Sequence, residues 1–475
     1  MPEQFLHGVE VVEIDNGPRP IRTVKSSIVG IVGTAPDADA TAFPLNTPVL
    51  VAGSRTAAAR LDTTGHGKGT LPAALDSIFD QIGAMVVVVR VDESSKTDAA
   101  EKAAETLANV LGGVDAATGQ YMGVHALLAA RTELDLVPRI LIAPGFTHTR
   151  TVGGILSAVV TEEGSGYTAA PAVAITGDGV GAEAVATIAD GAVSGITVTK
   201  PGRGYTTATI TLSGGGGADA TATASIGVLG NAVVAELVGI AERLRAVIIK
   251  DGPNTTDEAA VQDRNDWGTK RVFIVDPGAK VQAGTGIRDA WASAHVAGLI
   301  AKSDNDRGFW WSPSNQTING IVGTSRPVDF MLGDANCRAN YLNEHEVTTI
   351  LREDGFRLWG NRTCASDPKW AFLSVVRTAD MLNDSLQRAH LWAVDRNITK
   401  TYIEDVTEGV NAYIRSLVAQ GALLGGRCWA DPDLNSPANI SQGKVFFNFD
   451  FTPPYPAEHI TFRSHLVNDY IAEIL

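Results

Sequence analysis

Short apolar runs alternate with amphipathic stretches of helical period through most of residues 26–330. The apolar, β-branched runs are Met85–Val91, Arg139–Ala143, Ala246–Lys250 and Arg271–Val275. Strands that are apolar on both faces and are joined by helices are typical of parallel sheets. The pattern therefore predicts an α/β domain, with Thr97–Leu111 and Ala232–Arg245 as candidate crossover helices.

The first part of the chain follows a different pattern. Gly8–Ile14, Ile21–Val24 and Ser27–Val32 are predicted as short strands, and an Asn-Gly-Pro sequence marks a turn after the first of them. The prolines at positions 18 and 20 argue against a central place in a sheet, because proline has no amide hydrogen for the ladder. We expect this part of the chain at a sheet edge or in an arm.

Residues 151–230 do not share the α/β pattern. They contain no Phe, Trp, Met or Cys, and Gly, Ala, Thr and Val dominate. The segment is an internal duplication, whose matching pieces, at offsets of 38, 37 and 36 residues, are Gly164–Thr168 with Gly202–Thr206, Ile175–Gly177 with Leu212–Gly214, and Gly181–Ala184 with Gly217–Ala220. Two strand-rich copies with glycine turns predict a small all-β module, inserted in one surface loop of the α/β domain.

The C-terminal third predicts two helices. Asp367 and a following proline start the first, whose apolar face extends to Ala389. Thr399 is placed to cap the second helix, and Gly421 to end it.

Extended chain follows the second helix. Phe447, Phe449 and Phe451 alternate within the run Lys444–Phe451, and a proline-rich break at 453–456 leads to the extended run His459–Val467. A strand beyond a hinge has no evident partner in its own subunit. The sheet edge of another chain is its expected destination.

Composition and charge narrow the possible functions. The 475 residues include 38 Lys and Arg against 53 Asp and Glu, which gives a net charge of −15. Such a field repels phosphate backbones and anionic lipids, so we expect neither nucleic-acid binding nor membrane insertion. With neither a long apolar run nor a signal peptide in the sequence, we expect cytosolic folding without secretion.

The motifs associated with catalysis are all incomplete. Gly65–Thr70 resembles a phosphate loop, but Gly69 separates the lysine from the threonine. Thr349 stands where a zinc-protease pattern beginning at His345 needs a second histidine. The weak dinucleotide pattern Gly177–Ala182 lies inside the duplicated segment, without a crossover helix. The sequence thus indicates no catalytic, cofactor-binding or metal-binding residue, and we expect a protein that is not an enzyme.

Two residue types leave alternatives open. The tryptophans between 310 and 429 are interpreted as core residues rather than as a ligand platform. Cys337 lies in the polar loop Gly333–Arg338, where a thiol has little reason to pack. An intermolecular disulfide or a metal contact is one hypothesis for Cys337, and an inert surface thiol is the other.

The chain is similar to the contractile tail sheath proteins of myophages and tailocins, in the temperate-phage branch. Leu351–Cys364 carries the most specific part of this resemblance. The other similar segments are His7–Ile14, Ser27–Gly33, Asp37–Asp39, Phe43–Asn46, Pro48–Leu50, Lys68–Leu71, Pro138–Leu141, His390–Asp395, Gly409–Asn411 and Phe449–Pro453. The resemblance covers about residues 5–150 and 231–475, and the duplicated segment departs from it. Cys364 and Cys428 lie in family-like contexts, which implies a structural role.

The resemblance implies an assembly protein. Sheath subunits of this family form hexameric rings stacked helically around a tail tube, and their terminal arms add strands to neighbouring subunits. Contraction without nucleotide then drives the tube through the host envelope. The implied exchange residues are Val9, Val11 and Ile14 at one end and Ile460, Phe462 and Leu466 at the other. The implied partners are further copies, the tube protein, and baseplate and terminator proteins, in a virion assembled in the host bacterial cytoplasm.

These observations together predict an α/β and α+β multidomain protein: a tail-sheath core with mixed sheets and exchanged terminal strands, plus an inserted all-β module. The predicted parts are an N-terminal arm (1–25), an α/β domain (26–150 with 231–330), an outer module (151–230), an inner, tube-facing domain (331–456) and a C-terminal arm (457–475). One alternative is a surface adhesin or carbohydrate-binding protein that acts through 151–230, where host-surface material would bind. Another is an enzyme with a pocket near 65–70 or 250–257.

Overall fold

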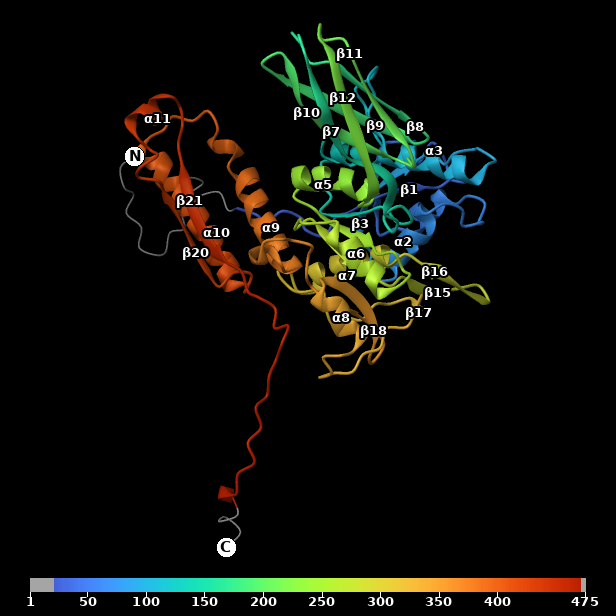
Figure 1. Ribbon diagram of the computed structural model, residues 1–475. Coiled ribbons are helices and arrows are strands. Elements are labelled where there is room, and N and C mark those ends of the chain that lie inside the picture. Colours follow the sequence, from blue (N-terminus) through green and yellow to red (C-terminus); the bar gives the residue numbers. More distant parts are fainter. Residues whose placement is uncertain (1–20, 471–475) are drawn as a thin grey trace.

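An eight-stranded, mostly parallel sheet forms the centre of the protein (Figure 1). The computed structural model describes residues 21–470. In sheet order the strands are β19 (Phe356–Trp359), β18 (Val347–Arg352), β14 (Val272–Val275), β13 (Val247–Asp251), β6 (Ile140–Ile142), β1 (Val29–Thr34), β3 (Met85–Val91) and β2 (Pro48–Ala52). Neighbours from β18 to β3 run parallel, and β19 and β2 are antiparallel edges. The four runs predicted as strands are confirmed as β3, β6, β13 and β14.

Helices cover both faces of this sheet. On β3, Val86 and Val88 belong to one core, with α2 (Leu71–Phe79) and α7 (Ala292–Asp306). Val87 and Val89 belong to the opposite core, with α3 (Ala99–Leu111) and α5 (Ala232–Leu244). Because the strand is buried on both sides, its sequence is continuously apolar from Met85 to Val89. The two crossover helices predicted from periodicity are confirmed as α3 and α5.

Shorter elements complete this domain. The helices are α1 (Arg55–Ala58), α4 (Ala130–Leu134), α6 (Asp257–Asn265) and α8 (Arg338–Glu344). The strands are β4 (Gly113–Val114), β5 (Tyr121–Met122), β15 (Ala279–Ala283), β16 (Gly286–Ala290) and β17 (Ile321–Thr324), of which the last three form a separate antiparallel sheet.

Three sequence predictions differ from this topology. The run Ile21–Val24, predicted as a strand, belongs to no strand, because its residues pack on helices α9 and α10 rather than beside a sheet. The run Ser27–Val32, expected at an edge, lies in central strand β1 between β3 and β6. The prolines that suggested an edge precede the strand and so do not break its ladder. The predicted boundary at 330 is also displaced, because β18 and β19 extend the main sheet as far as Trp359.

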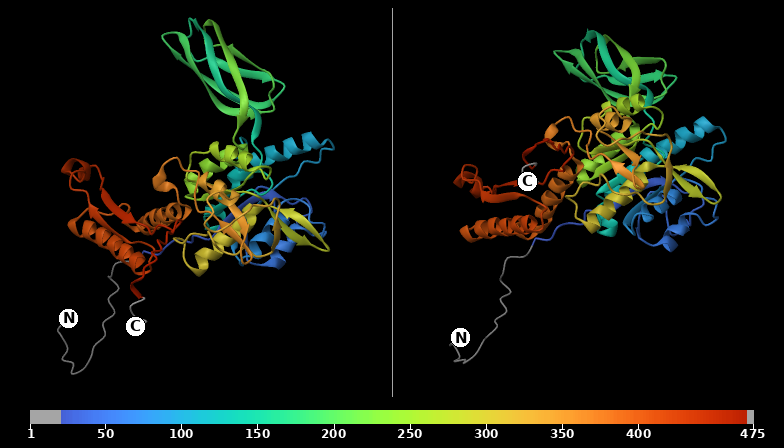
Figure 2. Two further views of the ribbon diagram at one scale, coloured as in Figure 1. Left: turned by 60° about the horizontal axis from the view of Figure 1, so that its bottom comes forward. Right: turned by 90° about the horizontal axis from the view of Figure 1, so that it is seen from below.

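Residues 151–229 form six strands that stand away from the main sheet (Figure 2). They are β7 (Thr151–Ser165), β8 (Ala172–Gly177), β9 (Val180–Ala189), β10 (Ala192–Arg203), β11 (Ala208–Ser213) and β12 (Ala218–Leu229). A four-stranded sheet of order β12-β7-β10-β9 packs with the pair β11-β8. We call these strands the β7–β12 unit. The chain leaves the main sheet after β6 and returns through α5 to β13, the neighbour of β6.

A third unit follows at the C-terminal end (Figure 1, orange and red). It contains α9 (Leu373–Ala389), α10 (Lys400–Ala419), α11 (Pro437–Ser441) and the antiparallel pair of β20 (Gly425–Ala430) and β21 (Phe447–Thr452). The predicted cap of the second helix is confirmed, because the amide of Tyr402 donates to the Thr399 hydroxyl at 3.1 Å. Leu382, Leu386 and Ile414 join the core between α9 and α10.

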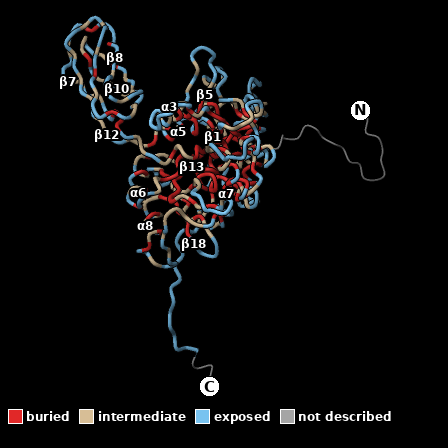
Figure 3. The backbone as a smooth tube through the Cα atoms, turned by 90° about the vertical axis from the view of Figure 1, so that its right-hand side faces the viewer, coloured by how far each residue is buried: buried red, intermediate tan, exposed pale blue. Residues whose placement is uncertain are grey.

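Burial is concentrated in the two cores of the main sheet, whereas most of the β7–β12 unit is exposed or intermediate (Figure 3). One buried side chain, His295, leads to a prediction about how the stability of the fold depends on pH. His295 on α7 is fully buried, and neither ring nitrogen has a hydrogen-bond partner among residues 21–470. Burial lowers the pKa of His295 to about 4; nearby Asp80 opposes this shift and Arg288 adds to it.

We expect His295 to make the fold acid-sensitive. An unfolded histidine takes up a proton near its ordinary pKa of 6.5, before the folded one does, so stability is present above this pH and is lost as pH falls toward 4. By pH 4.5 the loss amounts to roughly 2 to 3 kcal/mol. His295→Leu should remove this part of the difference between urea unfolding midpoints at pH 7 and pH 4.5. An unchanged difference would contradict the assignment.

Candidate assembly surfaces

The segment from Ile21 to Ile28 contacts helices α9 and α10 of the C-terminal unit and leads into β1 of the main sheet. Thr23 shares a hydrogen bond of 2.8 Å with the hydroxyl of Tyr413 on α10, and the amide of Val24 donates to Ser385 on α9 at 3.0 Å. Ile21 and Val24 pack against the core between these helices. Whatever precedes Ile21 therefore starts from a fixed place on the C-terminal unit.

The β20–β21 pair offers one open edge. On β20, the amide of Cys428 donates to Asn411 Oδ1 at 2.7 Å, and Asn411 Nδ2 donates to the carbonyl of Cys428 at 3.0 Å. That side chain on α10 therefore covers part of the outer edge of β20. Among residues 21–470, β21 pairs only with β20. Its outer backbone groups are free to receive another strand.

The chain beyond β21 is first clamped and then released. Glu458 accepts hydrogen bonds from the guanidinium of Arg362 at 2.8 and 2.5 Å, and the ring of Tyr455 lies edge-on to Phe372. From His459 to Tyr470 every described residue is exposed, and none belongs to a strand. This extension leads away from the body of the subunit (Figure 1).

The structure describes only the C-terminal set of the predicted exchange residues. Val9, Val11 and Ile14 lie outside the described residues. Ile460, Phe462 and Leu466 are 67%, 92% and 98% exposed. These three large apolar side chains are in contact with water in the isolated subunit. Their burial against another chain would be favourable, because it removes apolar surface from water.

The three cysteines are all buried and unpaired. Cys337, which was expected on the surface, is only 3% exposed at the start of α8. The next residue, Arg338, pairs with Asp257 at 2.7 Å and draws the start of α8 against α6. The surface placement was therefore wrong, and a thiol so placed is not accessible to a neighbouring subunit. Burial raises the pKa of Cys364 to about 12 and also raises that of Cys428, which suits inert core residues.

A row of buried ion pairs joins α9 to the sheet domain. Arg377 makes two hydrogen bonds of 2.5 Å to Asp304 at the end of α7 and one of 3.1 Å to the carbonyl of Ser26. Further along the same helix, Asp380 pairs with Arg271 and Asp384 with Arg139, which precede β14 and β6. The three positions on α9 follow helical spacing, so one face of the helix docks on one end of the sheet.

Sequence reasoning missed this interface. Arg377, Asp380 and Asp384 interrupt the apolar stripe of the predicted helix, and such charges are usually solvated. The available signal was their spacing of three and four residues, which places all of them on the face that carries Val376 and Leu373.

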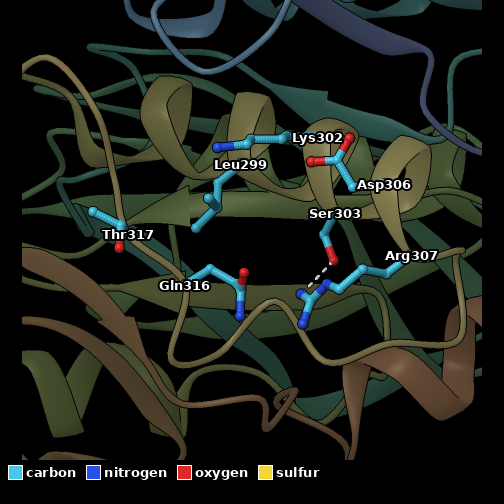
Figure 4. A pocket seen from close by; sticks show the side chains of 7 residues that line it. All are labelled: Leu299, Lys302, Ser303, Asp306, Arg307, Gln316 and Thr317. Atoms are coloured by element: carbon cyan, nitrogen blue, oxygen red, sulfur yellow. Dashed lines mark hydrogen bonds between the residues drawn. The ribbon is translucent and has the colours of Figure 1, made fainter.

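Two of the cavities in the described chain are lined by residues other than 65–70 and 250–257. A cavity of about 140 Å³ lies between the end of α7 and residues 316–317, where the Arg307 guanidinium donates to Ser303 (Figure 4). A second, of about 480 Å³, lies along Arg22–Ile28. Both are remote in sequence from 65–70 and 250–257. Within residues 21–470 no helix is long and apolar enough to span a bilayer, and no cluster of three or more His, Cys, Asp or Glu side chains is placed to bind a metal.

Comparison with known proteins identifies the family. The chain matches the models for the tail sheath protein Gp18 domain III N-terminal region at 26–91, the phage tail sheath protein central domain at 219–364 and the phage tail sheath C-terminal domain at 365–466. A prophage major tail sheath protein of Pseudomonas aeruginosa (strain UCBPP-PA14) is 39% identical over 474 residues, 99% of each chain. The chain belongs to the phage tail sheath family. The tail sheath protein of Escherichia phage P2 is 32% identical, over 99% of this chain and 98% of the phage protein.

Solved contractile assemblies share the fold. The sheath of an extracellular contractile injection system, the PVC sheath complex in its contracted state, gives a TM-score of 0.59 at 14% identity over 99% of both chains. The helical sheath of the anti-feeding prophage, also contracted, gives 0.57 at 16% identity over 96% of this chain and 98% of that one. The predicted mixed α/β multidomain fold and the sheath resemblance are thus confirmed. This tail sheath protein is a structural component of a phage-type contractile tail.

Proposed function

We propose that the subunit polymerises as hexameric rings stacked helically around a tail tube, and that contraction of this polymer drives the tube through the host envelope. The observation that carries the proposal is the run Ile460–Leu466, whose three large apolar side chains are exposed and have no strand partner among residues 21–470. The family membership supports the same conclusion. Baseplate and terminator proteins are the further partners that we propose, and assembly takes place in the host bacterial cytoplasm.

Strand exchange through the arms is the proposed link between subunits. The free outer edge of β21 is the acceptor, and the run Ile460–Leu466 of a neighbour is the strand that it receives. The N-terminal run with Val9, Val11 and Ile14 makes a corresponding link from the other end. Backbone ladders of this kind hold while the segments beside them rotate, so a sheath shortens without dissociating.

We assign the α9–β21 unit to the inner, tube-facing side and the β7–β12 unit to the outside. The β7–β12 unit stands away from the body (Figure 2), and the matched family ranges leave residues 92–218 uncovered. Its description as an insertion in a shared sheath core is part of this proposal. The adhesin alternative has less support, because Tyr167 and Tyr205 are the aromatic residues of the unit and both are buried.

Negative-stain electron microscopy of the purified, overexpressed chain tests the proposal. Hollow tubes of stacked rings are the expected result, with sixfold symmetry in end views. Because Cys337 is buried, the same tubes are expected with and without reducing agent. Discrete particles that never assemble, even when tube and baseplate proteins are added, would contradict the proposed function.

A further inference from the structure

The β7–β12 unit is built around a pseudo-twofold axis. Its sheet order, β12-β7-β10-β9, reads the same when the first copy of the duplication is exchanged with the second. The amide of Tyr167 donates to the carbonyl of Gly191 at 2.9 Å, and the matching amide of Tyr205 donates to Gly153 at the same distance. The two outer strands, β9 and β12, are therefore equivalent edges of one sheet.

Every register irregularity of this sheet lies in its inner strands. Relative to β12, the extra residues on β7 are Gly153, Leu156 and Thr161. Relative to β9, the extra residues on β10 are Ser194 and Thr199, which match Leu156 and Thr161 at an offset of 38. Bulges usually protect sheet edges by twisting the edge strand away. Here both edge strands run without an extra residue.

The other common protections are also missing from these edges. Neither β9 nor β12 contains lysine or proline, and their charged residues are Glu183, which Lys200 neutralises at 2.9 Å, and Asp219. Within the described chain, β9 pairs only with β10, and β12 pairs only with β7. No side chain of residues 21–470 caps either edge as Asn411 caps β20. Gly181 and Asp219 have left-handed backbone near the start of each strand, and the regular edges run from Ala182 to Ala189 and from Ala220 to Leu229. Open edges of this length are templates for further strands.

The unit is fixed to the subunit at its base. Arg150 makes hydrogen bonds of 2.6 and 2.5 Å to Asp266, and Asn231 Nδ2 donates to the carbonyls of Phe146 and Thr149 at 2.8 and 2.7 Å. Arg203 on β10 donates to the carbonyl of Ala104 on α3 at 2.9 Å. These contacts hold the edges at one angle to the body, so each copy in a regular array presents them identically.

We infer that β9 of one subunit pairs antiparallel with β12 of the next, so that the β7–β12 units form a continuous outer sheet along the polymer. The inference rests on the proposed helical assembly. The strand alternation requires this antiparallel sense, because each strand of the sheet runs opposite to its neighbours. A contact between two different edges is heterologous, and repeated heterologous contacts generate rings or open helices, as a sheath requires.

Cysteine cross-linking in assembled tubes tests the inference. Val185→Cys on β9 is combined in turn with Thr221→Cys, Thr223→Cys and Ser225→Cys on β12, which scans three registers on one face. Val185 and Ser225 lie in one row across four strands, which puts them about 14 Å apart within a subunit. A disulfide needs Cα atoms within about 7 Å, so any bond formed links two subunits. The native cysteines are buried and give little background.

Mild oxidation of tubes should produce a ladder of dimers, trimers and larger species with at least one of the three pairs. The matched control joins Thr176→Cys on β8, an exposed residue of the other sheet, to Thr223→Cys, and should stay monomeric. Tubes that give no ladder with any pair would overturn the inference and leave the proposed function intact. Failure of the wild-type chain to build tubes, even with tube and baseplate proteins added, would overturn both.

A charge pair provides a second measurement if the cysteine variants do not assemble. Val185→Lys with Thr223→Lys places like charges on both edges and should lower the urea concentration at which tubes dissociate. Val185→Lys with Thr223→Glu should restore most of that loss. Equal dissociation points for the two variants would count against edge pairing.

Discussion

Removal of residues 459–475 is expected to leave a folded subunit that builds no tubes. The shortened chain keeps the Arg362–Glu458 pair and loses described residues that are all exposed, so its unfolding midpoint in urea should stay unchanged. Assembly should fail because burial of Ile460, Phe462 and Leu466 at a neighbour contributes on the order of 6 kcal/mol per contact. Electron microscopy and sedimentation measure tube formation, and circular dichroism measures folding.

A substitution pair separates side-chain burial from chain length. When the run pairs as a strand at a neighbour, Ile460, Phe462 and Leu466 fall on one face, and Thr461, Arg463 and His465 fall on the other. Serine at the first three positions should abolish tubes, whereas serine at the second three should leave most tubes in place. Long tubes from the truncated chain would show that the C-terminal run is not the exchanged strand.

Asp304→Ala is expected to destabilise the subunit by about 3 to 5 kcal/mol, because it leaves Arg377 buried with only the carbonyl of Ser26 as a partner. The Arg377 and Asp304 side chains are 4% and 2% exposed, so water does not replace the lost carboxylate. Urea unfolding followed by tryptophan fluorescence measures the change.

Two comparisons make this result specific to a buried pair. The double substitution Asp304→Leu with Arg377→Met removes both charges and should recover most of the loss, since apolar replacement of a buried ion pair is often nearly neutral. Lys400→Ala breaks an exposed pair with Glu404 on α10 and should change stability by less than about 0.5 kcal/mol. A small effect of Asp304→Ala would show that α9 is held mainly by its apolar contacts.

The elements that were predicted well from sequence are those that a short stretch of neighbouring residues determines. Met85–Val89 is apolar on both faces because both faces are buried, and Thr399 caps α10 through an amide three residues away. The burial of Cys337 was not predictable in this way, because it depends on the Arg338–Asp257 pair, which joins positions 81 residues apart.

The assembly surfaces likewise differ in how far sequence alone could predict them. The exposed run that begins at Ile460 was predicted from its own sequence. Its apolar side chains alternate and follow a proline-rich break, and this pattern does not depend on knowing the partner. The open edge of β21 and the edges of β9 and β12 without bulges were not predicted. Whether a strand lies at an edge depends on which other strands pair with it, and sequence alone does not give this pairing. Register, and therefore the position of bulges such as Thr161, is fixed only once two strands are paired.

The clamp between Arg362 and Glu458 fixes the reach of the C-terminal arm. Leu466 is eight positions after Glu458, so a fully extended chain carries Leu466 at most about 28 Å from Glu458. A neighbour that receives all three apolar side chains must hold its acceptor edge within that radius in both the long and the short form of the tail. In the proposed exchange, the length of chain between the body of the subunit and Leu466 limits the travel between adjacent subunits, so inserting or deleting residues after Glu458 should lengthen or shorten the stroke.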